Sequence, residues 1–205
     1  MQTYIVLEKT GIESALEICL QALDKDGIVC VPTETVYGLI CSEKSKEAVQ
    51  RLVRLKRRPK DKPFALFTPS WSSLARAPIR SCSVAQKLAE RFWPGPLTLV
   101  IPAEKDCPCE YNGRVGVRSP DGEFIRALLA RRELLLVNTS LNRSGEAPVW
   151  RIDPEMEILR EVDVAVDQGR LPERSPSTVV DCTVVPPRVL RHGEITEEEI
   201  RETVK

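Results

Sequence analysis

The stretch IVCVPTETVYGL, residues 28–39, decides how this chain folds. Residues 28–31 form a short apolar run that Pro32 ends, a pattern typical of a strand buried on both faces of a sheet. The following residues, 32–39, contain three hydroxyl groups, one carboxylate and a glycine, which is unusual for a plain strand. A buried strand followed by such a polar stretch predicts a ligand site. The alternative is an edge strand whose threonines and tyrosine merely favour β structure.

Helical and strand patterns alternate on both sides of this stretch. Apolar residues recur at helical spacing over 12–23, 44–58, 84–92 and 124–129, and we expect a further surface helix in the acidic segment 194–205. Short apolar runs predict further strands at 64–67, 97–101, 114–117, 134–137, 162–166, 178–181 and 188–190. Such alternation predicts an α/β layered fold. Because no repeat or Gly/Ser-rich linker interrupts the chain, we expect one domain over residues 1–205.

The first two helices carry specific signals at their ends. Gly27 follows the helix over 12–23, and we expect it to end that helix in the left-handed conformation. Ser42 or Ser45 can cap the start of the helix over 44–58. Pro59 ends that helix, so the cations just before it lie at an element boundary, where their side chains can turn into a cleft.

Charge is balanced over the whole chain but concentrated in one segment. Thirty Lys and Arg offset thirty Asp and Glu, so no overall field attracts the protein to nucleic acid or anionic lipid. Within residues 44–62, nine basic residues accompany only two acidic ones. This excess predicts a local anion-binding face, and a solvated helix surface is the alternative.

Several classes of protein and site are excluded or disfavoured by composition. The odd count of seven cysteines, with no secretory leader and no long apolar run, predicts a cytoplasmic protein with free thiols and no membrane contact. The single histidine, His192, argues against a resident metal site or a Ser-His-Asp hydrolase, and the pair Cys107 and Cys109 has no predicted role. No glycine-rich phosphate-binding motif is present, so a bound nucleotide would have to be held by side chains.

A second polar segment, 138–145, follows the predicted strand at 134–137. Its short hydrogen-bonding side chains come where open α/β sheets bind ligands, at the carboxyl end of a strand. An ordinary Asn/Ser/Gly turn is the alternative. The shorter segments 177–181 and 191–193 are weak signals when each is taken alone.

Seven motifs in order give the chain a family resemblance over about residues 10–197. The motifs are PTETVYGL at 32–39, KxRP at 56–59, FWPGPLTLVIP at 92–102, VGVR at 115–118, TSxNxSG at 139–145, STVVD at 177–181 and LRxGxI at 190–195. With this set of motifs the chain resembles the YrdC/YciO family. The resemblance implies a twisted, mostly open mixed sheet with flanking helices around a large basic cavity.

The resemblance also implies a reaction and a set of site residues. L-threonine, bicarbonate and ATP, with Mg²⁺ on the ATP, would yield threonylcarbamoyl-AMP and pyrophosphate. This product would serve a downstream threonylcarbamoyl transferase that modifies tRNA to threonylcarbamoyladenosine. The implied catalytic residues are Lys56, Arg58, Ser140 and Asn142. Those implied to contact threonine or bicarbonate are Thr33, Arg118 and Ser177, and those implied to contact the nucleotide are Arg58, Ser140, Asn142 and Arg191.

The chain also departs from the family pattern. Many synthases of the family have Asn where this chain has Lys62 and His where it has Phe67, so the recognition of ATP and of the amino acid is open. One alternative is a YciO-like RNA-binding or ribosome-associated protein without synthase activity, which could contact tRNA or other RNA through a basic cleft. Another is a relative that uses carbamoyl phosphate in place of bicarbonate.

Overall fold

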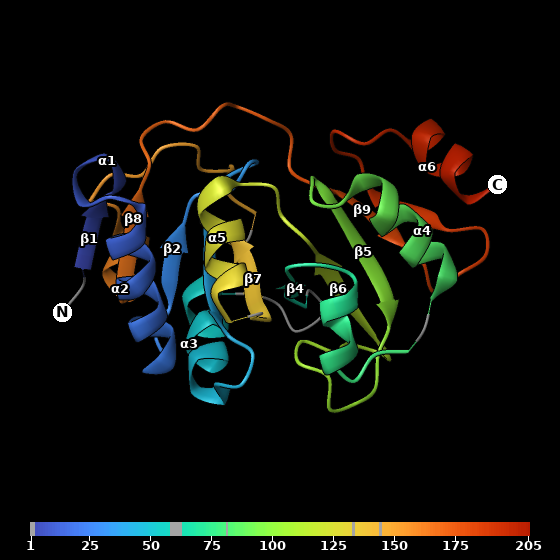
Figure 1. Cartoon of the computed structure of the whole chain (residues 1–205), viewed down its shortest axis with the longest axis horizontal. Helices are drawn as coiled ribbons and strands as arrows, with labels where there is room; N and C mark the ends of the chain where they lie inside the picture. The colour runs from blue at the N-terminus through green and yellow to red at the C-terminus, as the bar shows by residue number, and fades with distance from the viewer. Residues whose placement is uncertain (1–2, 58–62, 81, 133, 144) are drawn as a thin grey trace.

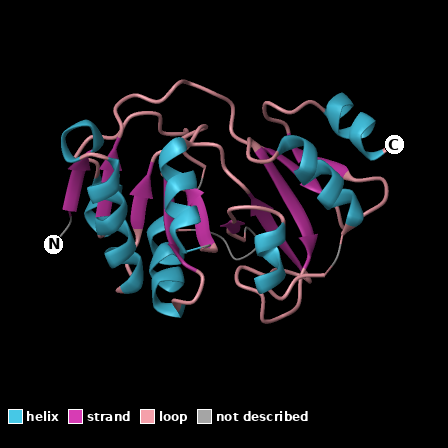
Figure 2. Ribbon diagram, viewed as in Figure 1, coloured by secondary structure: helices cyan, strands magenta, loops and turns pink. Residues whose placement is uncertain are grey.

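In the computed structural model, the described residues 3–57, 63–80, 82–132, 134–143 and 145–205 build one ten-stranded sheet flanked by helices (Figures 1 and 2). Arg58 and Lys62 lie outside these residues. The strand order is β1-β8-β2-β3-β7-β4-β6-β5-β9-β10. The strands are β1 (Thr3–Val6), β2 (Val29–Val31), β3 (Gly38–Ser42), β4 (Ala65–Phe67), β5 (Leu97–Pro102), β6 (Arg114–Arg118), β7 (Leu136–Ser140), β8 (Val164–Asp167), β9 (Thr178–Asp181) and β10 (Arg188–Arg191).

The sheet is mixed. Strand β8 runs parallel to β1 and β2, whereas β3 is antiparallel to both of its neighbours, β2 and β7. Strand β4 is antiparallel to β7 and parallel to β6, and β5 is antiparallel to β6 and parallel to β9. This arrangement confirms the predicted α/β fold with a mixed sheet.

Helices cover the two faces of the sheet unequally. Helices α2 and α5 lie side by side and pack on β2, β3 and β8 through one apolar cluster (Figure 1). Residues of α3, α4 and α6 belong to a second cluster on the opposite face. The helical segments are α1 (Leu7–Thr10), α2 (Ile12–Asp24), α3 (Lys46–Lys56), α4 (Ser83–Phe92), α5 (Glu123–Arg132) and α6 (Glu197–Val204), with short 3₁₀ turns at Ser72–Arg76 and Glu157–Glu161.

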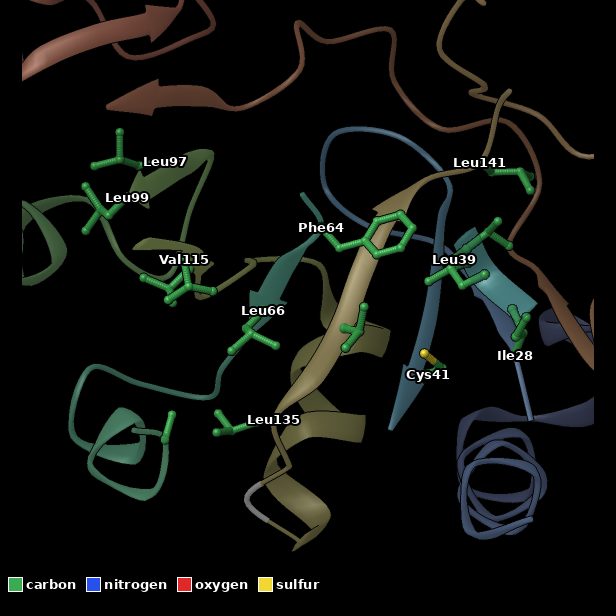
Figure 3. Packing of buried hydrophobic residues seen from close by; sticks show 14 of the residues in the cluster. Ile28, Leu39, Cys41, Phe64, Leu66, Leu97, Leu99, Val115, Leu135 and Leu141 are labelled. Carbon is green, nitrogen blue, oxygen red and sulfur yellow. The ribbon is translucent and has the colours of Figure 1, made fainter. Parts of the chain in front are cut away.

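Alternate side chains of the central strands point to opposite faces. Leu66, Val115 and Leu99 enter the larger apolar cluster together with their neighbours from β3 and β7 (Figure 3). The residues between them point to the face on which α2 and α5 lie, and these two helices cover mainly β2, β3 and β8. The rest of that face has no helix packed on it through either apolar cluster.

Most predicted elements are confirmed, and the differences have local causes. Strand β2 is fully buried, as the apolar run predicts, and all seven cysteines are free. Strands β1 and β3 are not among the predicted strands, although residues 39–41 of β3 form a continuous apolar run. Strand β7 begins two residues later than predicted and continues to Ser140, so the polar segment lies partly inside the strand. Among the described residues, no helix combines the length and apolar character needed to cross a bilayer.

The predicted left-handed role of Gly27 is wrong. Helix α2 ends before Lys25, and Asp26 has the positive φ of 58°. Gly27 is required for close packing instead, since a Cβ there would lie 2.6 Å from the carbonyl oxygen of Ala22. Its backbone N–H donates to that same oxygen at 2.8 Å, which explains why the chain approaches so closely.

Ser45, one of the two predicted caps, stabilises the start of α3. Its hydroxyl accepts a hydrogen bond from the Ala48 N–H at 3.0 Å. We expect Ser45→Ala to lower the free energy of unfolding by about 1 kcal/mol, because that N–H loses its partner. Urea unfolding measures the change. Ser42→Ala is the control, and an equal loss in both variants would contradict the assignment.

Candidate functional site

A cavity of about 560 Å³, here called the central cavity, opens on the uncovered part of the sheet. Its volume falls within the usual range for small-molecule sites. Its walls come from strands β3, β4, β5, β6, β7, β9 and β10 and from segments before or after them. The cavity includes the carboxyl end of β7, as the polar segment 138–145 predicts, and it extends from there over a sheet face, because alternate residues of the neighbouring strands point away from the core.

Ser140 and Asn142 form one wall of the central cavity, in a turn that we call the 140–142 turn. The Ser140 hydroxyl donates to Asn142 Oδ1 at 2.5 Å, and Asn142 Nδ2 donates to the Glu146 carbonyl at 2.7 Å. These bonds fix the orientation of both side chains before any ligand binds. The predicted pair is thus brought together at the end of β7.

Lys56 supports the 140–142 turn from the side of α3. The side chain is only 1% exposed although it carries a charge. Its ammonium group donates to the Ser140 carbonyl at 2.6 Å, to Asn142 Oδ1 at 3.0 Å and to the Asn142 carbonyl. These three acceptors satisfy a buried cation that water does not reach. The positive charge therefore lies directly behind the predicted reaction centre.

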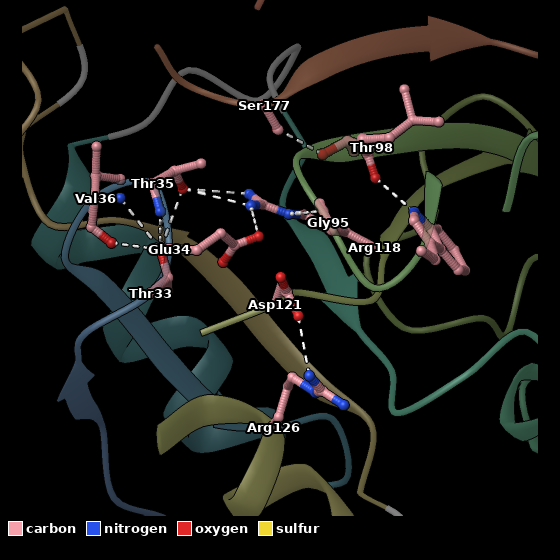
Figure 4. Close-up of polar contacts among 12 residues, drawn as sticks. Thr33, Glu34, Thr35, Val36, Gly95, Thr98, Arg118, Asp121, Arg126 and Ser177 are labelled. Carbon is pink, nitrogen blue, oxygen red and sulfur yellow. Dashed lines mark hydrogen bonds and ion pairs between the residues drawn. The ribbon is translucent and has the colours of Figure 1, made fainter. Parts of the chain in front are cut away.

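Arg118 and the polar stretch after β2 form a second wall (Figure 4). Arg118 Nη2 donates to Glu34 Oε1 at 2.5 Å, and both side chains are at least nine-tenths buried. Arg118 Nε donates to the Gly95 carbonyl at 3.0 Å, and its guanidinium lies 5.9 Å from the centre of the Phe67 ring. Glu34 Oε2 is buried without a hydrogen-bond partner among the described residues. The arginine is thus held rigidly.

Thr33 closes the turn that brings this stretch to the cavity. Its hydroxyl donates to the Val36 carbonyl at 2.6 Å and accepts from the backbone N–H groups of Thr35 and Val36, each at 3.2 Å. A threonine hydroxyl that bonds its own backbone in this way defines a turn rather than a strand. The alternative of a plain edge strand therefore does not hold at this position.

Ser177 and Arg191 form a third wall with Thr98. The Ser177 hydroxyl lies 2.8 Å from the Thr98 hydroxyl and accepts from Arg191 Nη2 at 2.9 Å. Arg191 also donates to the Ser177 carbonyl through Nε at 3.0 Å and Nη2 at 2.8 Å. Two segments that were weak signals alone are therefore joined by one guanidinium group.

The structure thus gathers most of the predicted site. Lys56 contacts this set from behind, while Arg58 lies outside the described residues and keeps its role as a prediction. The predicted basic character of the cavity stays a prediction, and residues 58–62 of the basic segment also lie outside the described residues. The residues brought around the cavity are Thr33, Arg118, Ser140, Asn142, Ser177 and Arg191.

Further lining residues were missed at the sequence level. Arg114 is the most significant, because it adds a third arginine to the cavity. Its position could have been found, since Arg114, Gly116 and Arg118 alternate along one predicted strand and so share a face. Asn138 belongs to the predicted polar segment 138–145, whereas the contacts of Tyr111 and Glu146 with the cavity have no comparable signal.

The cysteines take no part in the described cavity lining. Burial raises the pKa of the Cys107 thiol to about 11 and the pKa values of Cys41 and Cys182 to about 12. Since the thiolate is the reactive form, these three thiols stay protonated at neutral pH. In the described part of the chain, no three His, Cys, Asp or Glu side chains form a group that could hold a metal ion.

Comparison with known proteins shows a family. The profile of the Sua5/YciO/YrdC family, described as "Telomere recombination", matches residues 21–193. A threonylcarbamoyl-AMP synthase of Pyrococcus abyssi is 34% identical over 98% of this chain and 61% of its own length. The chain therefore spans less than two thirds of that relative.

Two solved structures extend the comparison. A structure of P. abyssi Sua5 complexed with L-threonine superposes with a TM-score of 0.85 at 30% identity, over 100% of this chain and 61% of the other. The crystal structure of Escherichia coli YciO superposes with a TM-score of 0.81 at 25% identity, over 98% of each chain.

Gly193 lets the turn after β10 approach the Ser177 segment. A Cβ at this position would lie 2.2 Å from the Pro176 carbonyl oxygen and 2.5 Å from the Thr178 nitrogen. We expect Gly193→Ala to lower the free energy of unfolding by about 1–3 kcal/mol, because backbone must move to admit the methyl group. Urea unfolding measures the loss. Its exposed neighbour provides the control, Glu194→Ala, and a Gly193→Ala variant as stable as that control would contradict the packing argument.

Proposed function

Because this chain belongs to the Sua5/YciO/YrdC family, we propose that it makes threonylcarbamoyl-AMP and pyrophosphate from L-threonine, bicarbonate and ATP. The product would supply the threonylcarbamoyl group for modification of tRNA. The observation that carries the proposal is the convergence of the 140–142 turn, Arg118 and the Ser177–Arg191 pair on one cavity. The relatives named as synthases and the complex of one of them with L-threonine support it.

The proposed reaction has two steps. The amine of threonine combines with bicarbonate to form a carbamate and release water. A carbamate oxygen then forms a bond to the α-phosphorus of ATP, while the bond from that phosphorus to the bridging oxygen of the β-phosphate breaks and pyrophosphate leaves. Three anionic groups must approach one another, so fixed positive charges and hydrogen-bond donors lower the barrier.

The described side chains fit these needs. Arg118, rigidly held by Glu34 and Gly95, would bind the threonine carboxylate near Thr33 and Ser177. Asn142 would donate its second Nδ2 hydrogen to the carbamate or to the α-phosphate, and Ser140 would do so once its hydroxyl turns away from Asn142 Oδ1. Lys56 would stabilise the same charge from behind the turn, and Arg58 would bind phosphate oxygens. Arg191 would contact the ATP phosphates from the wall formed with Ser177.

Other participants are also part of the proposal. Mg²⁺ would enter as the complex with ATP, bound by the phosphates of that substrate. A threonylcarbamoyl transferase would take the product, and tRNA would be the final acceptor. We place the protein in the cytoplasm, where these partners are found.

A YciO-like role is the second candidate, because the similarity to YciO covers nearly all of both chains. In that case the protein would bind RNA and would not make the adenylate. Exposed basic side chains on α3, at Lys46 and Arg54, and just after it, at Arg57, could contact phosphate groups of RNA.

Pyrophosphate release tests the proposed function directly. With Mg²⁺ present, we expect release only when ATP, L-threonine and bicarbonate are all supplied, because the carbamate is the attacking group. A coupled phosphate assay with each component omitted in turn measures this. No release in the complete mixture would refute the synthase, and steeply salt-dependent RNA binding would then favour the second candidate. Release with carbamoyl phosphate in place of bicarbonate would indicate the relative that uses carbamoyl phosphate.

Lys56→Ala tests the charge behind the 140–142 turn. We expect turnover to fall at least about 100-fold, because a fixed positive charge at the transition state is lost. We also expect the free energy of unfolding to fall by about 3 kcal/mol, because three acceptors lose a charged donor. Steady-state kinetics and urea unfolding measure the two effects.

The matched control for that variant is Lys46→Ala, at the exposed start of the same helix, which should retain both activity and stability. The predicted effect of Arg58→Ala on turnover is the same, about 100-fold. Wild-type turnover in Lys56→Ala would contradict the role proposed for the ammonium group.

A further inference from the structure

We propose that Arg114 is a further phosphate-binding residue of the central cavity, which holds the polyphosphate end of ATP and the pyrophosphate as it leaves. The inference rests on the proposed function and adds a residue to it. It follows from the turn that carries Arg114, from the strand register and from the ion pair that orients the side chain.

A tight turn brings Arg114 to the rim of the cavity. Asn112 and Gly113 both have positive φ, 53° and 75°, as a two-residue hairpin turn with Asn-Gly requires. The flanking residues are joined by two backbone hydrogen bonds, Tyr111 N–H to the Arg114 carbonyl at 2.9 Å and the reverse at 3.3 Å. Tyr111 and Arg114 therefore stand side by side where β6 begins, and both line the cavity.

The strand register places Arg114 opposite Ser140. Ala65 of β4 pairs with Asn138 of β7 on one side and with Gly116 of β6 on the other. Two residues further along, Ser140 and Arg114 lie at the same level, separated by two strand spacings. Their Cα atoms are therefore about 10 Å apart. An arginine side chain can span much of this distance, so both residues can contact one chain of phosphates.

No side chain rises from β6 between its two arginines, because the residue between them on that face is a glycine. Gly116 lies between them on the same face, and a Cβ there would already be 3.3 Å from the Ala65 Cβ and 3.6 Å from the Thr98 Cγ2. Arg114 and Arg118 are four residues apart on the strand, or about 13 Å. A ligand with anionic groups at both ends can thus lie along β6 between two guanidinium groups.

Asp181 orients the Arg114 guanidinium. Asp181 Oδ2 accepts from Arg114 Nη1 at 3.1 Å, while Oδ1 accepts from the N–H of Thr183 at 2.9 Å and from its hydroxyl at 2.5 Å. Asp181 is fully buried, whereas the Arg114 side chain remains 42% exposed. The carboxylate fixes one edge of the planar group, and the other N–H groups of its fork suit two phosphate oxygens.

The polyphosphate is the ligand that this position suits. Arg118 already lies with the proposed threonine contacts, so the amino-acid carboxylate has a partner at the other end of β6. Pyrophosphate gains negative charge as the bond to the α-phosphorus breaks. A guanidinium held near it lowers the energy of that transition state.

The test compares Arg114→Gln and Arg114→Lys with the wild-type protein. Glutamine can keep a hydrogen bond to Asp181 but removes the charge, and lysine keeps the charge but removes the fork. We expect Arg114→Gln to raise the KM for ATP and the inhibition constant of inorganic pyrophosphate at least about 10-fold, from the loss of charged hydrogen bonds. The KM for threonine should change less than about 2-fold, since Arg118 is untouched.

Arg80→Gln is the matched control, because Arg80 forms an exposed ion pair with Glu104 away from the cavity lining. Thermal unfolding establishes that the variants are folded. Should the glutamine variant unfold, the lysine variant takes its place, with an expected increase of at least about 3-fold in both constants. Unchanged constants for ATP and pyrophosphate, or an equal rise for threonine, would overturn the proposal.

Equilibrium binding separates this proposal from the proposed function. Calorimetry with inorganic pyrophosphate and Mg²⁺ needs no turnover. It therefore measures the contribution of Arg114 to pyrophosphate binding even if the wild-type protein releases no pyrophosphate from ATP. Weaker binding to the variant by at least about 10-fold supports the Arg114 site. Equal binding to the wild-type and variant proteins, or no binding to either, overturns it.

Discussion

Successive side chains of a strand must point to opposite faces, and the site of this protein depends on that constraint. On β4 to β7 one set of side chains is apolar and packs into the large cluster on the face shared with α3, α4 and α6. The alternate set includes Gly116, Arg118, Asn138 and Ser140, which line the central cavity. One set of strands therefore supplies both the stability of the sheet and its binding surface, and the part of that face that α2 and α5 leave uncovered becomes the place where ligands can lie.

Three cationic groups at or behind the cavity are each held by partners before a ligand arrives. Lys56 donates to the 140–142 turn, Arg118 pairs with Glu34, and Arg114 pairs with Asp181. Removing a charge from water is costly unless such partners replace the lost hydration. The same partners restrict the motion of the cationic groups. A substrate that carries several negative groups would then meet donors already in place, so less reorganisation accompanies the reaction.

Family membership and the length of the relatives bear on different questions. The family profile spans most of the chain, and the similarity to YciO extends over nearly all of both proteins. The P. abyssi synthase, in contrast, continues well beyond the matched part. A single domain over residues 1–205 stays a prediction, and the choice between synthase and RNA-binding protein rests on chemistry at the cavity rather than on the fold.

The sequence by itself determined the elements and motifs whose signals are local. The buried strand β2, the amphipathic helices, the polar stretch at 32–39 and the ordered family motifs are all visible in consecutive residues. Only the tertiary structure decided that Lys56 lies behind the 140–142 turn, that Glu34 holds Arg118 and that Arg114 lies at the same level of the sheet as Ser140. Each of these contacts joins residues far apart in the chain, through the order and register of strands. Local periodicity reports which face a side chain takes, but it carries no information on which strand lies beside it.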